Sequence, residues 1–508
     1  MKVLLKTKKK YLFIGILITV LLLAAIYFTG IWELRSGLPF ASQLARAGRG
    51  LNRYEIQAEF NPDAKTLKCS QRVEYINRTA NHFTHLYFHL YPNSYRYENK
   101  PVFEKNDMEL AYPKGFSPGM LEMDNILIDG EPADFVIGGY SENILMLILR
   151  GSLAPGEKAV IEMDYRVVLP YCMGRFGYGD NMYKAVNWYP IACVYDENGW
   201  NLDPYHIIGD PFYSDTANYR VWIQAPAGYE IAATGDMAGR REEEDYVIWE
   251  FDAPAVRDFA FLAGNRYQAA SQKIGKTTVT SYYFTENAGL KALDYAAQAL
   301  AYFNEAFGEY PYPRFNLVES DFYIGGMEYP CLIMLDHNLY ERSESDWLEM
   351  VTVHETAHQW WYGLVGNNQI TDAWLDEGLT EYSTVLYYGH RYGQEKEEEV
   401  YKNLIGEGKY KNLQYIFSSD DIDETIHRPV HEFPNWSVYD LLVYGKGAML
   451  FHSLREEIGD ELFFKSLQLY FRENCFKNAG KEDIIKAFNQ ITGKDWQQHF
   501  DRWLYEHE

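Results

Sequence analysis

The sequence predicts a multidomain protein with an N-terminal transmembrane helix, an all-β domain and then an α+β domain that is mostly helical. Three observations predict this order. An uncharged apolar run begins at residue 11, a period-two pattern of apolar residues begins near residue 51, and helical spacing takes over near residue 290. The 508 residues are enough for two or three domains, and a hydrophobic content of 47% is enough for buried cores.

The N-terminal segment places five lysines before an apolar stretch. The lysines stand at positions 2, 6, 8, 9 and 10, and the run from Tyr11 to Trp32 is uncharged and about long enough to span a bilayer. Lysines on one side only predict an N-terminus in the cytoplasm and the bulk of the chain outside it. A cleaved signal peptide is the competing interpretation, but no small-x-small site closes the run. We therefore expect residues 1–35 to be a lysine-rich tip and membrane anchor, followed by a linker at 36–50.

Residues 51–267 are expected to form the β domain. Tyr54, Ile56 and Ala58 alternate with polar neighbours, which is typical of a half-buried strand. Turn residues such as Pro155-Gly156 separate many of the later runs. These runs lie at 86–90, 143–149, 160–165, 219–223, 247–251 and 259–263.

Residues 268–508 are expected to form the α+β domain. Helical spacing begins at Leu290, and helices dominate from Trp347 onward. Two short segments at 314–318 and 333–335 are rich in apolar residues and should form a small sheet beside these helices.

A metal-binding pattern, H-E-T-A-H, occupies His354, Glu355 and His358. The residues before it lack proline and glycine, so we expect a helix that continues past the motif until Gly363 ends it. Residues four apart share one face of a helix, so both imidazoles can bind one ion, and Glu355 lies close enough to act on a metal-bound water. Two imidazoles and one carboxylate would leave the fourth position open, as in catalytic zinc sites.

The third ligand should come from a second helical run that starts near Asp372. Four carboxylates are candidates in this run, and spacing alone does not choose among them. They are Asp372, Asp376, Glu377 and Glu381.

The motif H-E-x-x-H, followed after 18 residues by the Glu of W-L-D-E-G, resembles the aminopeptidase N family of zinc metallopeptidases, the gluzincins. The resemblance implies that Glu377 is the third ligand of one zinc ion per chain. Glu381 lies one turn further along, and we expect it to accept the other N–H of a ligating histidine. The alternative for Glu381 is an exposed carboxylate on the helix surface.

The segment Gly325-Gly326-Met327-Glu328-Tyr329 precedes the metal helix and by itself predicts a glycine-led loop or edge strand. It resembles the family's G-x-M-E-N element, which implies that these residues bind substrate and that Glu328 pairs with its free α-amine. The glycines allow the backbone to run close to a peptide. Tyr329 stands where the family usually has Asn, which is a departure at one substrate hydrogen bond.

Tyr444 opens the sequence Y-G-K-G-A before an apolar run, where a tyrosine is usually a core residue. The sequence resembles the family's Y-x-K-G-A element, which implies that the hydroxyl of Tyr444 faces the metal. We expect this hydroxyl to stabilise the oxyanion that develops on the attacked carbonyl. Tyr439 is expected to line the same cleft.

The resemblance implies a zinc-dependent aminopeptidase that hydrolyses the N-terminal peptide bond with a zinc-activated water and Glu355 as general base. Its partners would be peptides with a free N-terminus, and the net charge of −25 argues against nucleic acid. Two alternatives stay open. One is a zinc endopeptidase with relaxed exopeptidase control, and the other is a non-catalytic peptide-binding ectodomain.

The resemblance covers about residues 51–508 and implies a saddle-like β domain followed by a thermolysin-like catalytic domain. Many relatives continue into a helical domain that covers the cleft, whereas this sequence stops soon after Leu504. We therefore expect a more open cleft, or one that a partner or a second copy closes. Five widely spaced cysteines predict no disulfide framework, with Cys172 and Cys193 the nearest pair.

Overall fold

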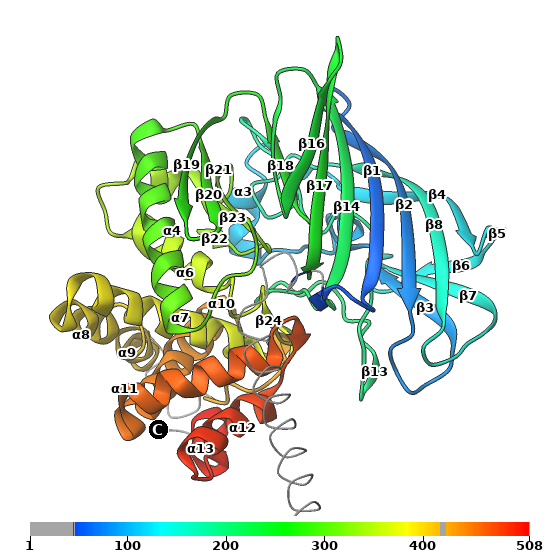
Figure 1. Cartoon of the computed structure of the whole chain (residues 1–508). Helices are drawn as coiled ribbons and strands as arrows, with labels where there is room; N and C mark the ends of the chain where they lie inside the picture. Colours follow the sequence, from blue (N-terminus) through cyan, green and yellow to red (C-terminus); the bar gives the residue numbers. More distant parts are fainter. Residues whose placement is uncertain (1–43, 45, 417–422, 507–508) are drawn as a thin grey trace, which may run out of the picture. The chain divides into compact units, whose positions relative to one another are not determined.

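The computed structural model describes residues 44, 46–416 and 423–506. The chain divides into two compact units, residues 1–49 and residues 50–508, and the architecture below is that of the second unit (Figure 1). The predicted boundary at residue 267 lies inside this unit and stays our proposal. The five cysteines all lie among the described residues, and none forms a disulfide.

The predicted membrane localisation is corrected. Within the described ranges, no helix is both long enough and apolar enough to cross a bilayer. The run from Tyr11 to Trp32, which carried the prediction, lies outside these ranges. We therefore withdraw the single-pass anchor, the cytoplasmic N-terminus and the extracytoplasmic catalytic domain.

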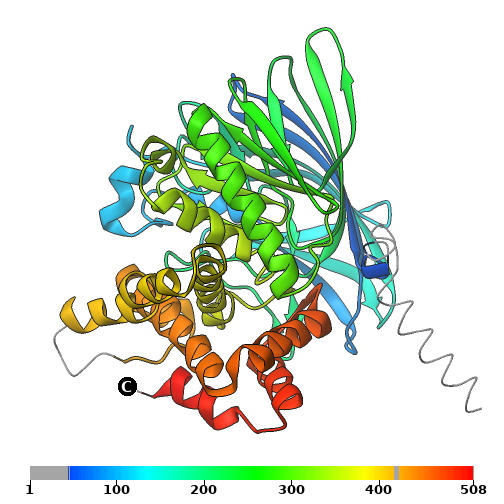
Figure 2. The ribbon, with the colours of Figure 1, turned by 60° about the vertical axis from the view of Figure 1, so that its left-hand side comes forward.

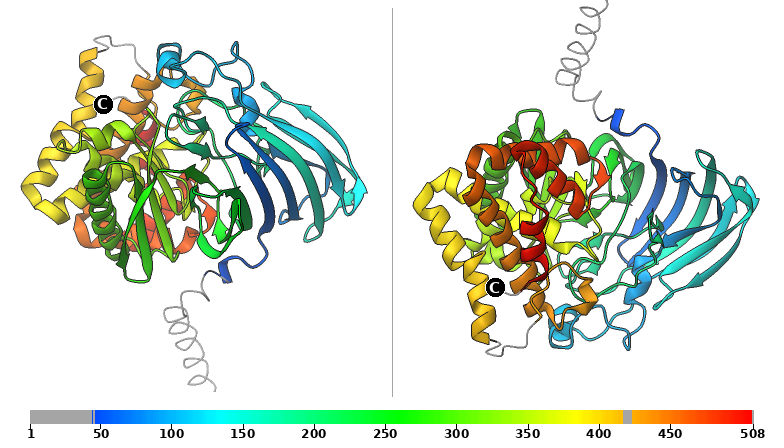
Figure 3. Two further views of the ribbon diagram at one scale, coloured as in Figure 1. Left: turned by 90° about the horizontal axis from the view of Figure 1, so that it is seen from above. Right: turned by 90° about the horizontal axis from the view of Figure 1, so that it is seen from below.

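The alternating pattern near residue 54 produces a strand at the centre of the largest sheet. Tyr54, Ile56 and Ala58 are buried and their neighbours are more exposed, so one face of β1 packs on the core. In the described part of the chain this sheet has eight strands, which lie side by side in one twisted layer (Figures 1 and 3). In spatial order they are β16 (Asp236–Glu242), β17 (Tyr246–Val256), β14 (Ala217–Pro226), β1 (Asn52–Asn61), β2 (Thr66–Ile76), β8 (Lys158–Val168), β4 (Met120–Ile128) and β5 (Glu131–Pro132).

The rest of the N-terminal half is also mainly β, as predicted. The core face of β1 meets the segment around Tyr189, whose ring centroid lies 5.8 Å from that of Tyr54. Two smaller sheets and a hairpin complete this half. They contain β15 (Glu230–Ala233), β18 (Phe261–Gly264), β10 (Tyr183–Ala185) and β9 (Gly177–Tyr178); β11 (Ile191–Ala192), β3 (Phe83–His89), β7 (Ile144–Leu153) and β6 (Asp134–Gly138); and β12 (Tyr195–Asp196) with β13 (Gly199–Trp200).

A separate sheet supports the metal helices. The two predicted segments are its strands β21 (Arg314–Ser320) and β23 (Leu332–Asp336), which are parallel neighbours. Among the described residues, β22 (Gly326–Met327) pairs only with β23 and therefore forms an edge, which places the glycine-led segment on an edge strand. The other strands are β19 (Gln268–Ile274) and β20 (Thr277–Tyr283), and the long helix α4 (Glu286–Ala306) packs against both (Figure 2).

Helices fill the C-terminal part, and two of them cross with almost no space between their backbones. A Cβ atom on Gly378 of α7 would lie only 2.8 Å from the Cα of Gly447 at the start of α11. The two glycines therefore let these helices touch directly. The helices are α3 (Met108–Ala111), α5 (His337–Glu341), α6 (Trp347–Ala357), α7 (Ala373–Tyr392), α8 (Gln394–Asn403), α9 (Glu407–Ile416), α10 (Trp436–Tyr439), α11 (Gly447–Asn474), α12 (Lys481–Thr492) and α13 (Gln497–Tyr505), together with the short helices η1 (Tyr91–Tyr95), η2 (Lys105–Asp107) and η3 (Val430–Glu432) and the π-helix η4 (Asp440–Lys446).

The helix that carries the H-E-T-A-H motif, α6, ends at Ala357, which is earlier than predicted. Tyr362 has a φ of 108°, which no α-helix accommodates, and its carbonyl accepts a hydrogen bond of 2.7 Å from Nε of Arg257. Arg257 follows β17, is buried, and also donates to the carbonyls of Ser214 and Lys477. This tertiary contact fixes the turn after α6, so local helix propensity does not decide where the helix ends.

Candidate active site

Three side-chain atoms from α6 and α7 converge on one point. The Nε2 atoms of His354 and His358 lie 3.1 Å apart, and Oε2 of Glu377 lies 3.1 Å from His358 Nε2 and 3.4 Å from His354 Nε2. A tetrahedral ion with ligands at about 2.0–2.1 Å would separate them by about 3.3 Å. The donor set and these separations therefore fit zinc.

The end of α6 and the start of α7 create this geometry. His354 lies in the last turn of α6, and His358 caps it with helical dihedral angles, so the spacing of four keeps both rings on one side. Nδ1 of His358 lies 3.0 Å from the carbonyl oxygen of Trp361 and 3.2 Å from the hydroxyl of Thr380. When Nδ1 donates its hydrogen to Trp361, the lone pair of Nε2 is free to face the ion.

The second nitrogen of His354 meets a carboxylate. Nδ1 of His354 lies 3.4 Å from Oε2 of Glu381, whose Oε1 lies 2.6 Å from Nζ of Lys409. Burial alone would raise the pKa of Glu381, but Lys409 and His354 lower it to about 2. Glu381 is buried, which excludes the alternative of an exposed surface carboxylate.

The other two carboxylates of the run point elsewhere. Oδ1 of Asp372 lies 3.2 Å from Nδ1 of His427, and Oδ2 of Asp376 accepts a hydrogen bond of 2.9 Å from Gln369. Of the four candidates, Glu377 is the one whose oxygen joins both imidazoles.

Glu355 lies in the same cavity and is 5% exposed. Within the described residues, its Oε2 has no hydrogen-bond partner, and burial raises the pKa of its carboxyl to about 8. A buried carboxylate oxygen without a partner is free to accept a proton from a substrate or a water.

Gly326 of β22 makes room for this carboxylate, since a Cβ atom there would lie 2.0 Å from Oε1 of Glu355. Gly326→Ala is therefore expected to displace Glu355 and to lower kcat/KM by about 100-fold, the cost of a misplacement of about 1 Å. Steady-state hydrolysis of peptide substrates measures this. Gly138→Ala, where the new methyl group meets open space, is the control, and wild-type kcat/KM in Gly326→Ala would remove the proposed contact.

Tyr444 reaches the metal ligands from the π-helix η4. Its hydroxyl donates a hydrogen bond of 2.7 Å to Oε1 of Glu377, and its ring stacks on that of His354 at 5.9 Å. π-helical turns are rare and frequent at functional sites. Tyr439 is fully buried and is not among the residues that line the cavity. Its hydroxyl packs against Gly209, where a Cβ atom would lie 2.9 Å from it.

The cavity around His354, His358 and Glu377, which we call the trio, has a volume of about 230 Å³. The residues Gly325, Gly326, Met327 and Glu328 line it, whereas Tyr329 is fully buried and does not. Glu328 is buried as well, and its Oε1 lies 3.4 Å from Nε2 of Gln369.

Two charged residues that the sequence did not single out complete the wall. Arg175 and Asp210 form a buried ion pair at 2.5 Å, and Nε of Arg175 lies 3.1 Å from the sulfur of Met327. Carboxylate oxygens of Asp210, Glu328 and Glu377 lie within 4.8 Å of one another. Burial raises the pKa of Asp210 to about 7, although Arg175 lowers it, so this wall favours an incoming cation.

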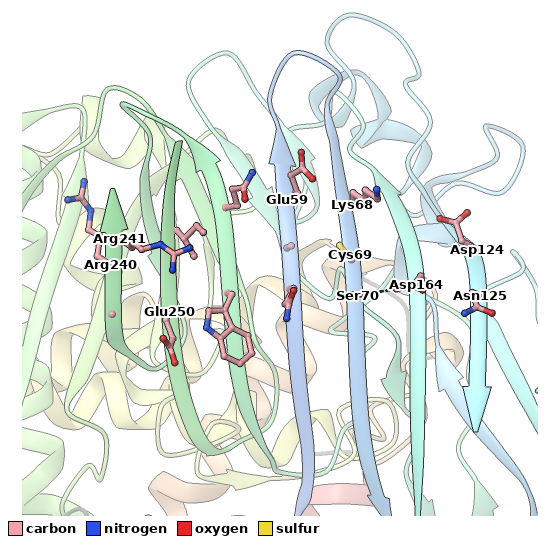
Figure 4. Close-up of a pocket in the computed structure, with 16 residues that line it drawn as sticks. Glu59, Lys68, Cys69, Ser70, Asp124, Asn125, Asp164, Arg240, Arg241 and Glu250 are labelled. Atoms are coloured by element: carbon pink, nitrogen blue, oxygen red, sulfur yellow. Dashed lines mark hydrogen bonds between the residues drawn. The ribbon is translucent and has the colours of Figure 1, made fainter. Parts of the chain in front are cut away.

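A larger hollow of about 950 Å³ lies on the outer face of the largest sheet (Figure 4). Several of its polar side chains already have partners. Ser70 bonds to Asp164, and Glu250 bonds to Arg220 beside the hollow. It contains none of the histidines or carboxylates of the trio, so the smaller cavity is the candidate active site.

Comparison with known proteins identifies the region of the chain that carries these residues. Residues 291–503 match the peptidase family M1 domain. Aminopeptidase N of Lactococcus lactis subsp. lactis is 28% identical over 332 residues, which are 62% of this chain and 38% of that protein. Aminopeptidase M1-B of Oryza sativa subsp. japonica is 26% identical over 380 residues, 72% of this chain and 42% of that protein. The chain thus spans less than half the length of these curated relatives.

Solved structures show the same fold. The M1 zinc metallopeptidase from Deinococcus radiodurans superposes with a TM-score of 0.61 at 16% identity, covering 90% of this chain and 95% of that one. The multidomain fold, with an N-terminal β domain and a mainly helical part that carries the trio, is therefore the fold of that metallopeptidase. The family match and these relatives together show that residues 291–503 form a peptidase family M1 domain and that the chain is similar to aminopeptidase N.

Proposed function

We propose that this protein is a zinc-dependent aminopeptidase that hydrolyses the N-terminal peptide bond of peptides, with one zinc ion per chain. The observation that carries the proposal is the position of Glu328, whose carboxylate lies within 4.8 Å of Glu377 and Asp210. An anchor for a substrate ammonium thus stands beside the metal ligands.

Covalent geometry explains why this separation matters. In a peptide, the α-amino nitrogen is about 2.5 Å from the first carbonyl carbon, because two bonds of about 1.5 Å join them. An ammonium held by Glu328 therefore brings the first carbonyl, and no later one, to the trio. Charge-assisted hydrogen bonds to a buried carboxylate are strong enough to fix this register.

The edge strand β22 supports the binding of an extended peptide whose N-terminus lies at Glu328. One side of β22 pairs with β23 and the other side has no partner strand among the described residues. An extended peptide can add to such an edge through main-chain hydrogen bonds. Gly325 and Gly326 lie here, so the peptide backbone can approach closely.

A zinc ion bound by His354, His358 and Glu377 would polarise the carbonyl and lower the pKa of a water. Glu355 accepts the proton of the attacking water on its free oxygen and delivers it to the departing amine. The hydroxyl of Tyr444 shifts from Glu377 to the oxygen of the attacked carbonyl, where negative charge develops.

The endopeptidase and binding-module alternatives have no observation in their favour. An endopeptidase would have to place an uncharged peptide bond against the buried carboxylate of Glu328, so that no substrate ammonium would pair with its charge. A binding module would not need an unpartnered Glu355 beside a trio that fits zinc.

Glu328→Gln is expected to reduce the preference for free over acetylated N-termini by about 10- to 100-fold, the value of a charged hydrogen bond. Hydrolysis of a panel of aminoacyl-arylamides, free and N-acetylated, measures the preference before and after a chelator. Glu344→Gln, on an exposed carboxylate, is the control. An unchanged preference would remove Glu328 from this role, and activity that survives complete metal removal would refute the zinc peptidase itself.

A further inference from the structure

Lys409 of α9 is a cation beside the metal ligands that the mechanism above does not use. Its Nζ lies 2.6 Å from Oε1 of Glu381 and 2.8 Å from Oδ1 of Asp440. It also lies 4.7 Å from the ring centroid of Tyr444, within range of a cation–π contact. One ammonium therefore contacts a carboxylate of α7, a carboxylate of η4 and the ring that stacks on His354.

The two imidazoles differ in how they are held. His358 is oriented by the carbonyl of Trp361, a backbone group that cannot rotate away. His354 is oriented by the side chain of Glu381, which is free to rotate unless something fixes it. The contacts that fix Glu381 are therefore decisive for His354.

Lys409 supplies the charged contact that fixes Glu381. The carboxylate bonds Lys409 with one oxygen and faces Nδ1 of His354 with the other. With the carboxylate held in this way, Nδ1 of His354 keeps its hydrogen, and the lone pair of Nε2 is free to face the ion position that it shares with His358 and Glu377. Without Lys409, the buried carboxylate of Glu381 would lose the charged contact that fixes its orientation.

We propose that Lys409 is a positioning residue of the metal centre, which holds Glu381 against His354. This inference rests on the proposed zinc site but not on the proposed peptidase activity. Lys409 acts through other residues and takes no part in proton transfer.

The zinc dissociation constant, measured by competition with a chromophoric chelator in the absence of substrate, tests the inference. Lys409→Met should raise this constant about 10- to 100-fold, the usual effect of losing an outer-shell partner of a metal ligand. Lys409→Arg should recover most of the affinity. Lys411→Ala, on the same helix and paired with Glu407, should leave the constant unchanged.

A double-mutant cycle shows whether Lys409 acts through Glu381. The loss in Lys409→Met/Glu381→Gln should equal the loss in Glu381→Gln alone, because the partner of Lys409 is already absent. Two losses that multiply, or wild-type zinc affinity in Lys409→Met, would overturn the proposal. A rise in KM for peptides with unchanged zinc affinity would make Lys409 a substrate-binding residue instead, which also overturns it.

Folding is checked separately by circular dichroism of the zinc-free proteins. If Lys409→Met does not fold, Lys409→Gln takes its place, since it keeps an N–H donor without the charge. The same order of zinc affinities is expected, and wild-type affinity in Lys409→Gln would contradict a role for the charge. The zinc affinities are measured without peptide, so they do not depend on whether the protein is an aminopeptidase.

Discussion

Glu355→Gln is expected to retain zinc and to lose hydrolysis by about 100- to 10,000-fold, the contribution of a general acid–base group. Glutamine has nearly the same size, but its amide cannot take up the proton of the attacking water. The free Oε2 of Glu355 has no hydrogen-bond partner among the described residues, so the substitution breaks no contact there. Turnover of an aminoacyl-arylamide, together with the metal content of the purified variant, measures the effect.

A second buried carboxylate on α6 provides the matched control. Glu349 accepts hydrogen bonds of 3.0 Å from Tyr387 and 2.9 Å from Tyr392, and a glutamine oxygen can accept the same bonds. Glu349→Gln should therefore keep its turnover. Full activity in metal-loaded Glu355→Gln would refute the assignment of Glu355 as the base.

Tyr444→Phe is expected to lower kcat by about 100- to 1000-fold, the usual cost of an oxyanion donor. The hydroxyl lies on an oxygen of Glu377 in the absence of substrate, so it needs only a small movement to reach the attacked carbonyl. The measurement is steady-state kinetics, in which KM should change much less than kcat because the contact forms in the transition state.

The bond between Tyr444 and Glu377 also suggests what a different result would mean. If Tyr444→Phe loses zinc affinity and its kcat recovers at saturating zinc, the hydroxyl serves to hold the ligand. A change in KM alone would make Tyr444 a binding residue. Tyr439→Phe is the neighbouring control, because within the described residues its hydroxyl has no hydrogen-bond partner and the ring lies outside the cavity.

The closeness of the two histidines could be predicted because residues four apart share one face of a helix. His354 and His358 lie four apart and meet at 3.1 Å, as expected for one helix face. The choice of Glu377 could not be made by spacing, because Asp376 is its neighbour in sequence. Only the direction of α7 decides it, and that direction depends on packing between helices, as at the contact of Gly378 with α11.

The part of the cavity wall formed by Arg175 and Asp210 could not be predicted, because it depends on contacts between distant parts of the chain. Arg175 and Asp210 lie in irregular segments of the N-terminal half, where no periodic pattern marks a buried charge. Their meeting with Met327 depends on how β22 lies against that half. For the same reason Tyr329, expected at the cavity from its place after Glu328, is fully buried and does not line it.

The contacts of Arg257 bear on whether the C-terminal half could fold as a separate fragment. Arg257 directly follows β17 of the large sheet, and its guanidinium donates to the carbonyls of Tyr362 and Lys477 in the helical half. A fragment beginning at residue 268 would lose this cation and leave those acceptors unpaired in a dry interior. We therefore expect that residues 268–508 do not fold as an autonomous module, because the turn after α6 is held by a side chain from the N-terminal half.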